Sequence, residues 1–88
     1  MKVLTTIEEK DDEGLMSLLG EKVLIITSGY FYSGKLVGVN ESCIKLSEPA
    51  IVYETGSWSN KSYKDEQSLH VDCWYIQLGE IESFGVGK

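Results

Sequence analysis

Three consecutive strands are predicted by residues 18–46, and this stretch constrains the fold more than any other part of the chain. The first strand is rich in β-branched side chains and ends at the turn signal Ser28-Gly29. The second contains Gly34 and Gly38, which weaken a flat strand but permit a sharp bend. A tight polar turn leads to the third strand at Cys43. A long second strand that bends at glycines is how a small sheet curls into a barrel.

Two further strands are predicted after a polar stretch. The third strand continues through Pro49, which cannot donate to a strand ladder and therefore predicts a bulge or an unpaired side. Residues 55–69 are polar and rich in turn formers, so we expect a long loop or a hairpin extension there. The predicted antiparallel strands cover residues 22–28, 30–40, 43–54, 70–78 and 80–85.

An arm and a short helix are expected before the first strand. Residues 1–10 are interpreted as a flexible arm or an extra strand. Asp11 or Asp12 can cap a helix that ends at Gly20, a residue suited to the C′ position. Its apolar face, which we expect to lie over the open end of the barrel, would be made by three residues: Leu15, Leu18 and Leu19.

A single domain spanning residues 1–88 is expected, because the chain is too short for two independent cores. The core is predicted from the apolar positions of the strands and the end of the helix. These positions are Leu19, Val23, Ile25, Leu36, Val39, Ile44, Leu46, Ile76, Ile81 and Phe84.

Several classes of function are disfavoured by the composition. The sequence shows no signal peptide and no apolar run long enough to cross a bilayer, so we expect a cytoplasmic protein with no membrane role. Cys43 and Cys73 do not make a disulfide framework. His70, Asp72 and Cys73 lack the paired spacing of a zinc site. With one histidine and no nucleophile–base pattern, we expect neither an enzyme nor a bound metal or other cofactor.

The charge balance disfavours a general nucleic-acid binder. The chain has 14 acidic residues and 8 basic residues, all of the latter lysines, for a net charge of −6. The acidic residues gather toward both ends, and residues 22–50 are slightly basic. Such a chain has no long-range attraction for a polyanion. A local site is still compatible with the composition, because screening confines charge effects to about 10 Å.

The aromatic residues allow structural and binding interpretations. Phe31, Trp74 and Tyr75 lie in predicted strands and are interpreted as core or subunit-contact residues. Trp58 lies among serines and asparagine with no obvious local core. Its predicted role therefore stays open between a structural one and contact with a neighbouring subunit or a ligand.

The chain has a set of spaced glycines and apolar residues: Gly20, Val23, Ile25, Gly29, Tyr32, Gly34, Leu36 and Val39. This set resembles the first signature of the Sm-like proteins, the Sm, Lsm and Hfq group. The resemblance covers roughly the middle third of the chain, and a weaker match to the second signature lies near Gly79. It implies a mostly β fold, a small five-stranded antiparallel SH3-like or Sm-like barrel with a short N-terminal helix, which assembles into rings and commonly binds RNA.

The uridine pocket of that family is only partly reproduced. The family builds it from two turns, one reading D-x-(stacking side chain)-(apolar)-N and one containing arginine followed by glycine. Here Asn40 stands at the aspartate position, Ser42 at the stacking position and Leu78 where the arginine is expected, and both turns are one residue short. Leucine cannot supply the charge-assisted hydrogen bonds of arginine. The departures suggest a distant member of viral or phage origin.

Two functions stay open at this point. The first is a ring that binds single-stranded RNA with altered base recognition, and the second is a structural or protein-interaction ring without RNA. An RNA site is expected where the two turns meet, with phosphate contacts from Lys22, Lys35 or Lys45. The candidate RNA-binding residues are Asn40, Ser42, Cys43, Gln77, Gly79 and Lys35.

Self-assembly into a closed ring of about five to seven subunits is expected, because the edges of a small open barrel must be paired or protected. The fourth predicted strand of one subunit would pair with the fifth of the next. The candidate subunit-contact residues are Trp74, Ile76, Ile81 and Phe84.

Overall fold

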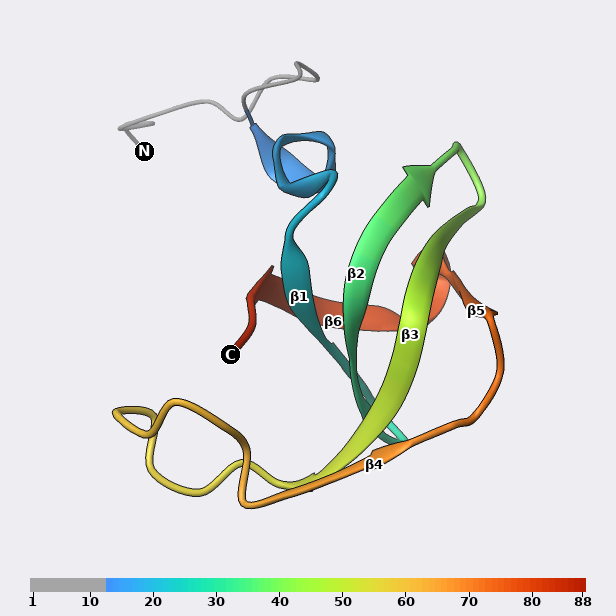
Figure 1. The fold of residues 1–88 in the computed structure, drawn as a ribbon. Coiled ribbons are helices and arrows are strands. Elements are labelled where there is room, and N and C mark those ends of the chain that lie inside the picture. The colour runs from blue at the N-terminus through green and yellow to red at the C-terminus, as the bar shows by residue number, and fades with distance from the viewer. Residues whose placement is uncertain (1–12) are drawn as a thin grey trace, which may run out of the picture.

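The computed structural model describes residues 13–88 (Figure 1). The expected arm at 1–10 and the candidate helix caps Asp11 and Asp12 lie outside these residues. The described chain forms one antiparallel β-sheet with two short 3₁₀ helices, so the predicted β class is confirmed. Within residues 13–88, no helix is long and apolar enough to cross a membrane.

Six strands and two 3₁₀ helices follow one another along the described chain. All strands except β4 lie where the sequence predicts them, with small differences at their ends. The elements are η1 (Gly14–Leu18), β1 (Lys22–Thr27), β2 (Phe31–Val39), β3 (Cys43–Glu54), β4 (Asp65–Ser68), β5 (Cys73–Gln77), η2 (Leu78–Glu80) and β6 (Ile81–Val86).

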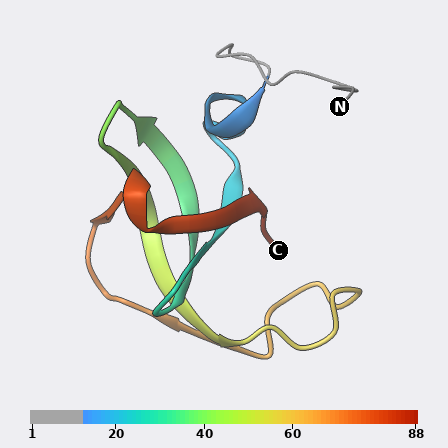
Figure 2. The same cartoon turned by 180° about the vertical axis from the view of Figure 1, so that it is seen from behind.

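The long strand β3 organises the sheet because it has partners on both edges. On one edge it pairs with β2, and on the other its residues 43–47 pair with β5 and its residues 50–54 with β4. The strand order is β4-β3-β2-β1-β6, with β5 also beside β3. The short helix η2 joins β5 to β6, which runs across the other strands to pair with β1 (Figure 2).

A bend in β2 and β3 occurs where Gly34 faces a bulge. The register between the two strands shifts at Gly34, opposite residues 47–50. In the bulge, Glu48 has a φ of 49°, in the left-handed region, and Pro49 follows it. Pro49 lies between the part of β3 that pairs with β5 and the part that pairs with β4. The predicted bend at a glycine and the predicted bulge at Pro49 are therefore confirmed.

The predicted N-terminal α-helix is wrong, because η1 is a five-residue 3₁₀ helix. Its first residue, Gly14, has a φ of 67°, which an α-helix does not contain. A 3₁₀ helix has about three residues per turn, so Leu15 and Leu18 share one face and pack against the core. Leu19 turns away and is exposed. Gly20 does end the helix as predicted, with a φ of 89°.

The strand β4 lies in the polar stretch that was predicted as a loop or hairpin extension. Its sequence, DEQS, has low intrinsic strand preference, but its backbone pairs with the outer part of β3, and pairing decides over propensity. A loop at 55–64 precedes β4, and a turn at 69–72 follows it. His70 in that turn has a φ of 55°. The strand predicted at 70–78 therefore begins only at Cys73.

Two apolar clusters lie on opposite faces of β1, since successive side chains of a strand point to opposite faces. The main core contains Val23, Ile25, Leu36, Ile44, Leu46 and Ile76. The second, which we call the outer core, contains Leu24, Val52 and Tyr63, with Ile26 and Phe31 packed against it. Tyr63 comes from the 55–64 loop, so this loop covers the outer core.

The predicted core is confirmed for the six residues of the main core. Val39 and Ile81 are half-buried and pack against it. The prediction is wrong for Leu19 and for Phe84, whose exposed fraction is 42%. Phe84 lies on β6, and β1 is the strand that β6 pairs with among the described residues, so one side of its ring stays uncovered.

The bend at Gly34 gives a stability test. A Cβ added at Gly34 would lie 3.0 Å from the Ser47 carbonyl oxygen and 3.2 Å from Leu46 Cβ, so we expect Gly34→Ala to lower the free energy of unfolding by about 1–3 kcal/mol. At Gly38 the nearest atom would be Lys45 Cβ at 3.5 Å, so Gly38→Ala should change it by less than about 0.5 kcal/mol. Urea unfolding measures both, and equal losses would contradict the steric explanation.

Candidate functional site

The two turns expected to form an RNA site do lie together. Cys43, the first residue of β3, pairs with Gln77, the last residue of β5. The backbone N–H of Leu78 donates to the Ser42 carbonyl oxygen at 2.9 Å. The pairing of β3 with β5 therefore holds the turn 40–43 beside residues 77–78, where the sequence predicted them to meet.

The side chain of Asn40 stabilises its own turn. Its Oδ1 accepts hydrogen bonds from the backbone N–H of Ser42 and of Cys43, both at 2.8 Å, and from the Ser42 hydroxyl at 3.1 Å. The Asn40 backbone N–H also donates to the Cys43 carbonyl oxygen at 3.0 Å. This is the local hydrogen bonding that makes asparagine a turn former. The acceptor of the Asn40 amide is thus already used within the turn.

The second turn presents two exposed polar side chains, those of Gln77 and Glu80. Gln77 is exposed at the end of β5, and Gly79 has no atom within 4 Å of the place where a Cβ would lie. Leu78 is half-buried and packs against the main core. The position at which the resemblance implies an arginine therefore stabilises the core and presents no cation.

The candidate lysines separate into two places. Lys45 lies with its Nζ 5.8 Å from the centre of the Tyr75 ring. Both residues line a cavity of about 230 Å³ beside the turn, together with Asn40 and Cys43. Of the two alternatives predicted for Tyr75, core or subunit contact, the core position is wrong, because the side chain is exposed. It faces away from Ile76 because side chains alternate along β5, which is the signal that could have placed it on the surface.

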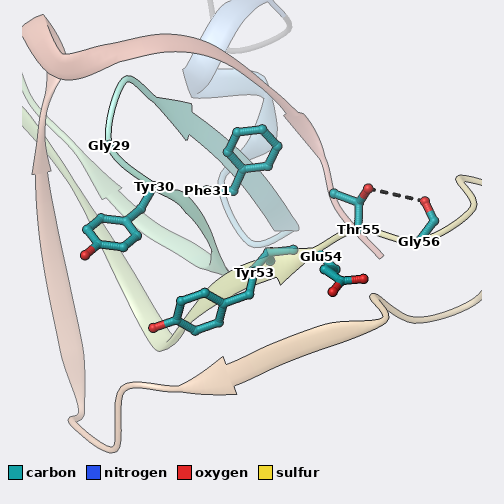
Figure 3. Close-up of a pocket in the computed structure, with 8 residues that line it drawn as sticks. Gly29, Tyr30, Phe31, Tyr53, Glu54, Thr55 and Gly56 are labelled. Atoms are coloured by element: carbon teal, nitrogen blue, oxygen red, sulfur yellow. Dashed lines mark hydrogen bonds between the residues drawn. The ribbon is translucent and has the colours of Figure 1, made fainter.

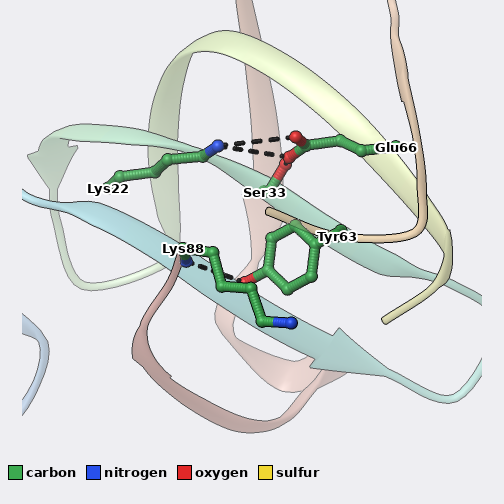
Figure 4. A network of polar contacts seen from close by, with 5 residues as sticks. All are labelled: Lys22, Ser33, Tyr63, Glu66 and Lys88. Carbon is green, nitrogen blue, oxygen red and sulfur yellow. Dashed lines mark hydrogen bonds and ion pairs between the residues drawn. The ribbon is translucent and has the colours of Figure 1, made fainter. Parts of the chain in front are cut away.

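Lys22 and Lys35 lie elsewhere, in a cavity of about 550 Å³ that also contains Glu48 and Glu66. The Nζ of Lys22 is 3.4 Å from a Glu66 carboxylate oxygen. Glu66 also accepts a hydrogen bond from the buried hydroxyl of Ser33 (Figure 4). The structure therefore does not bring Lys35 to the turns, and Lys22 is paired with a carboxylate.

The candidate subunit-contact residues differ in exposure. Ile76 is buried in the main core, and Ile81 is half-buried against it. Trp74 and Phe84 keep exposed fractions of 39% and 42%. β5 pairs with β3 and β6 pairs with β1, and among residues 13–88 neither has a partner on its other edge. The two strands named in the predicted contact thus present free backbone edges.

The loop 55–64 is fixed by Lys88. The Lys88 Nζ donates to the carbonyl oxygens of Thr55 at 3.0 Å and Ser57 at 2.7 Å. It also lies 5.4 Å from the centre of the Trp58 ring and 5.0 Å from that of Tyr63. Trp58 is 66% exposed, but its ring has a cation–π partner within the chain. A structural role for Trp58, one of the two predicted alternatives, is therefore present.

Tyr63 joins this loop to the outer core and to Lys88. Its hydroxyl accepts a hydrogen bond from the Lys88 backbone N–H at 3.1 Å (Figure 4). Burial raises the pKa of the Tyr63 phenol above its ordinary value of 10.0. The hydrogen bond from Lys88 opposes that rise, and the negative charge of Glu66 adds to it.

Two further cavities are lined by aromatic side chains and share Tyr30. The first, which we call the tyrosine groove, has a volume of about 620 Å³ and includes Phe31, Tyr53 and Glu54. The rings of Tyr30 and Tyr53 extend toward the same side of the molecule (Figure 3). The second, which we call the aromatic cavity, has a volume of about 360 Å³ and lies between the β1–β2 turn and β5. Its lining includes Tyr30, Tyr32, Trp74, Tyr75, Gln77 and Glu80.

Metal-ligating side chains do not gather in the described part of the chain. Within residues 13–88 there is no group of three or more histidine, cysteine, aspartate or glutamate residues that could hold a metal ion. His70 and Asp72 lie in the turn before β5, and Cys43 and Cys73 are both free thiols.

Comparison with known proteins gave no relatives: no family model matches the chain, no curated protein matches it, and no solved structure matches it.

The raised pKa of Tyr63 predicts a pH dependence of stability. Because the folded state holds the phenol proton more tightly than the unfolded chain, the contribution of Tyr63 is fully present below pH 10.0 and is lost as the pH rises through the folded pKa. We expect wild type to lose more free energy of unfolding than Tyr63→Phe between about pH 8 and about pH 10.5. Urea unfolding of both proteins at both pH values measures the difference, since other groups titrate alike in the two. An equal loss would contradict the raised pKa.

Proposed function

We propose that this chain is an Sm-like protein, in which the bent sheet closes into a small barrel and copies assemble into a homo-oligomeric ring. The observation that carries the proposal is the pair of free edges on β5 and β6. Unpaired strand edges invite pairing with another chain unless they are protected. Exposed apolar side chains accompany the β6 edge, since Phe84 and Val86 lie on that strand.

A ring follows from the use of two different edges. If β5 of one copy pairs with β6 of the next, the contact is heterologous, and it repeats until rotation closes it. Such closure pairs the free edges of β5 and β6 in every copy, and about five to seven subunits is the size that the resemblance favours. In this contact Phe84 supplies an apolar side chain, whereas Ile76 and Ile81 support it from within the subunit.

The ring proposal is tested by placing a charge at the contact. We expect the wild-type chain to sediment as a closed ring at micromolar concentration, and Phe84→Glu to sediment as a monomer, because burying an unpaired carboxylate is costly. Tyr53→Glu is the matched control, since Tyr53 is also an exposed ring but lies on β3, away from the free edges of β5 and β6. A monomeric wild type, or dissociation by both changes, would contradict the proposed contact.

Single-stranded RNA is the ligand that we propose for this ring, with base recognition that differs from the family pattern. Gln77 is exposed beside the turn 40–43 and can offer hydrogen bonds to a base edge. Tyr75 and Lys45 line the adjoining cavity, and an exposed ring with a nearby cation suits a base and its phosphate. Altered recognition is proposed because Leu78 packs into the core and the Asn40 acceptor is used in its turn.

A structural or protein-interaction ring is the second candidate. Two observations favour it: the net charge of −6 and the internal use of the Asn40 amide oxygen. Neither of these hinders a ring whose task is to hold proteins together.

Electrophoretic mobility shifts with U-rich and A-rich oligonucleotides distinguish the two candidates. RNA binding should weaken between about 50 mM and about 200 mM salt, because phosphate contacts release counterions. We expect Gln77→Ala to weaken binding by about three- to tenfold, which is the loss of one or two hydrogen bonds. Gln67→Ala is the matched control, since Gln67 is an exposed glutamine on β4. No shift at the lower salt favours the interaction ring, and equal effects of both changes would remove the turn site.

A further inference from the structure

The aromatic cavity differs from the other cavities in its charge. The cavities beside the turn and around Glu66 contain lysines, and Glu54 of the tyrosine groove is paired with Lys64 at 3.2 Å. In the aromatic cavity the charged lining residue is Glu80, which has no ion-pair partner among the described residues. Its environment is therefore negative and rich in ring faces.

The rings of this cavity stand at an angle to one another. Tyr30 and Tyr32 have ring centres 6.1 Å apart and planes inclined by 64°. Trp74 enters from β5, the opposite side of the cavity. Tyr30 is half exposed and Trp74 is 39% exposed, so solvent reaches both rings. Three aromatic side chains and one carboxylate that line the same cavity form a combination that attracts an organic cation.

We propose that the aromatic cavity binds an alkylammonium group, carried by a lysine side chain of a basic peptide. The ammonium would lie among Tyr30, Tyr32 and Trp74, where the negative ring faces attract it, and Glu80 would neutralise its charge. The net charge of −6 on the whole chain also attracts a positively charged peptide.

The same chain already holds one ammonium group in this way. Lys88 lies 5.4 Å and 5.0 Å from the centres of a tryptophan ring and a tyrosine ring, those of Trp58 and Tyr63. The aromatic cavity has the same types of ring, but no lysine is among its lining residues. The aromatic cavity is therefore open to a cation from another molecule.

A nucleotide suits this cavity less well than a cation. Bases stack on aromatic rings, but each base carries a phosphate that needs a cation nearby. The lining supplies no lysine, and Glu80 would repel the phosphate. The proposed RNA site adjoins this cavity through Tyr75 and Gln77, but Lys45, the cation of that site, is not among the lining residues here.

The tyrosine groove provides room for the rest of a peptide. It adjoins the aromatic cavity through Tyr30 and continues past Phe31 to Tyr53. Figure 3 shows the Tyr30 and Tyr53 rings extending to the same side, so a chain held at Tyr30 can continue along Tyr53.

The test uses tryptophan fluorescence of the full chain. The chain has two tryptophans, so Trp58→Phe leaves Trp74 as the one emitter. Short capped peptides with one lysine among glycines and serines are titrated, the lysine being unmodified, trimethylated or acetylated. We expect both cationic peptides to shift Trp74 emission with half-saturation at about 1 mM. The neutral acetylated peptide should bind about tenfold more weakly or less well still. The tighter of the two cations identifies a plain or a methylated lysine as the natural group.

Variants in the same background separate charge from folding. Glu80→Gln should weaken binding by about three- to tenfold, and Tyr30→Leu by about two- to fivefold, which are the effects expected of one charge and one ring. The matched control is Glu82→Gln, which removes the same charge from an exposed position of β6 that lines none of the cavities described above, and it should leave binding within about twofold.

The proposal would be overturned by no response of Trp74 to either cation at about 10 mM, by an equal response to the acetylated peptide, or by equal effects of Glu80→Gln and Glu82→Gln. A subunit contact that covers Trp74 would give the first result. A U-rich oligonucleotide that shifts Trp74 and competes with the cationic peptides would assign the cavity to bases and overturn it too. Failure of the RNA experiment does not overturn this proposal, because the side chains that would contact the ammonium are not the ones changed there: Tyr30, Tyr32, Trp74 and Glu80.

Discussion

The close approach of β2 to β3 at Gly34 is the constraint on which the rest of the structure depends. At this point the Ser47 carbonyl leaves no room for a side chain, and the bulge at Glu48 and Pro49 turns β3. Because β3 turns there, one of its edges serves two strands: β5 pairs before the bulge and β4 after it. The β5 pairing in turn places Gln77 beside the turn 40–43. A local backbone contact thus determines where the candidate RNA site and the free edges lie.

Apolar side chains pack on both faces of the sheet, although the chain is short. The main core occupies one face, and the outer core is completed only when Tyr63 of the loop 55–64 covers Leu24 and Val52. The polar group at the border of the outer core is satisfied as well, since the Ser33 hydroxyl donates to Glu66 and Lys22 neutralises that carboxylate. A loop rich in serine is therefore part of the packed structure.

The sequence allowed the strands, the bend and most of the main core to be predicted, because periodicity and glycine positions are local signals. Contacts between distant residues were not accessible in this way. The strand DEQS forms because β3 offers a free edge, and its own residues do not favour it. The partner of Trp58 is Lys88, far along the chain. The turn could be placed from the sequence, but the threefold use of the Asn40 amide oxygen is visible only in the structure.

The attachment of the loop 55–64 to Lys88 links it to β6. Lys88 follows Gly87, whose N–H donates to the Lys22 carbonyl at 2.8 Å, so the loop is anchored where β6 leaves β1. Segments that share an anchor open together, and cooperative units of this kind exchange their amide hydrogens together. Thr55 and Lys88 are 33 residues apart, yet a hydrogen bond joins the loop to the residue that ends the chain after β6. Any partner that stabilises β6 at the sheet edge would therefore slow hydrogen exchange on the far side of the molecule, in the loop that covers the outer core.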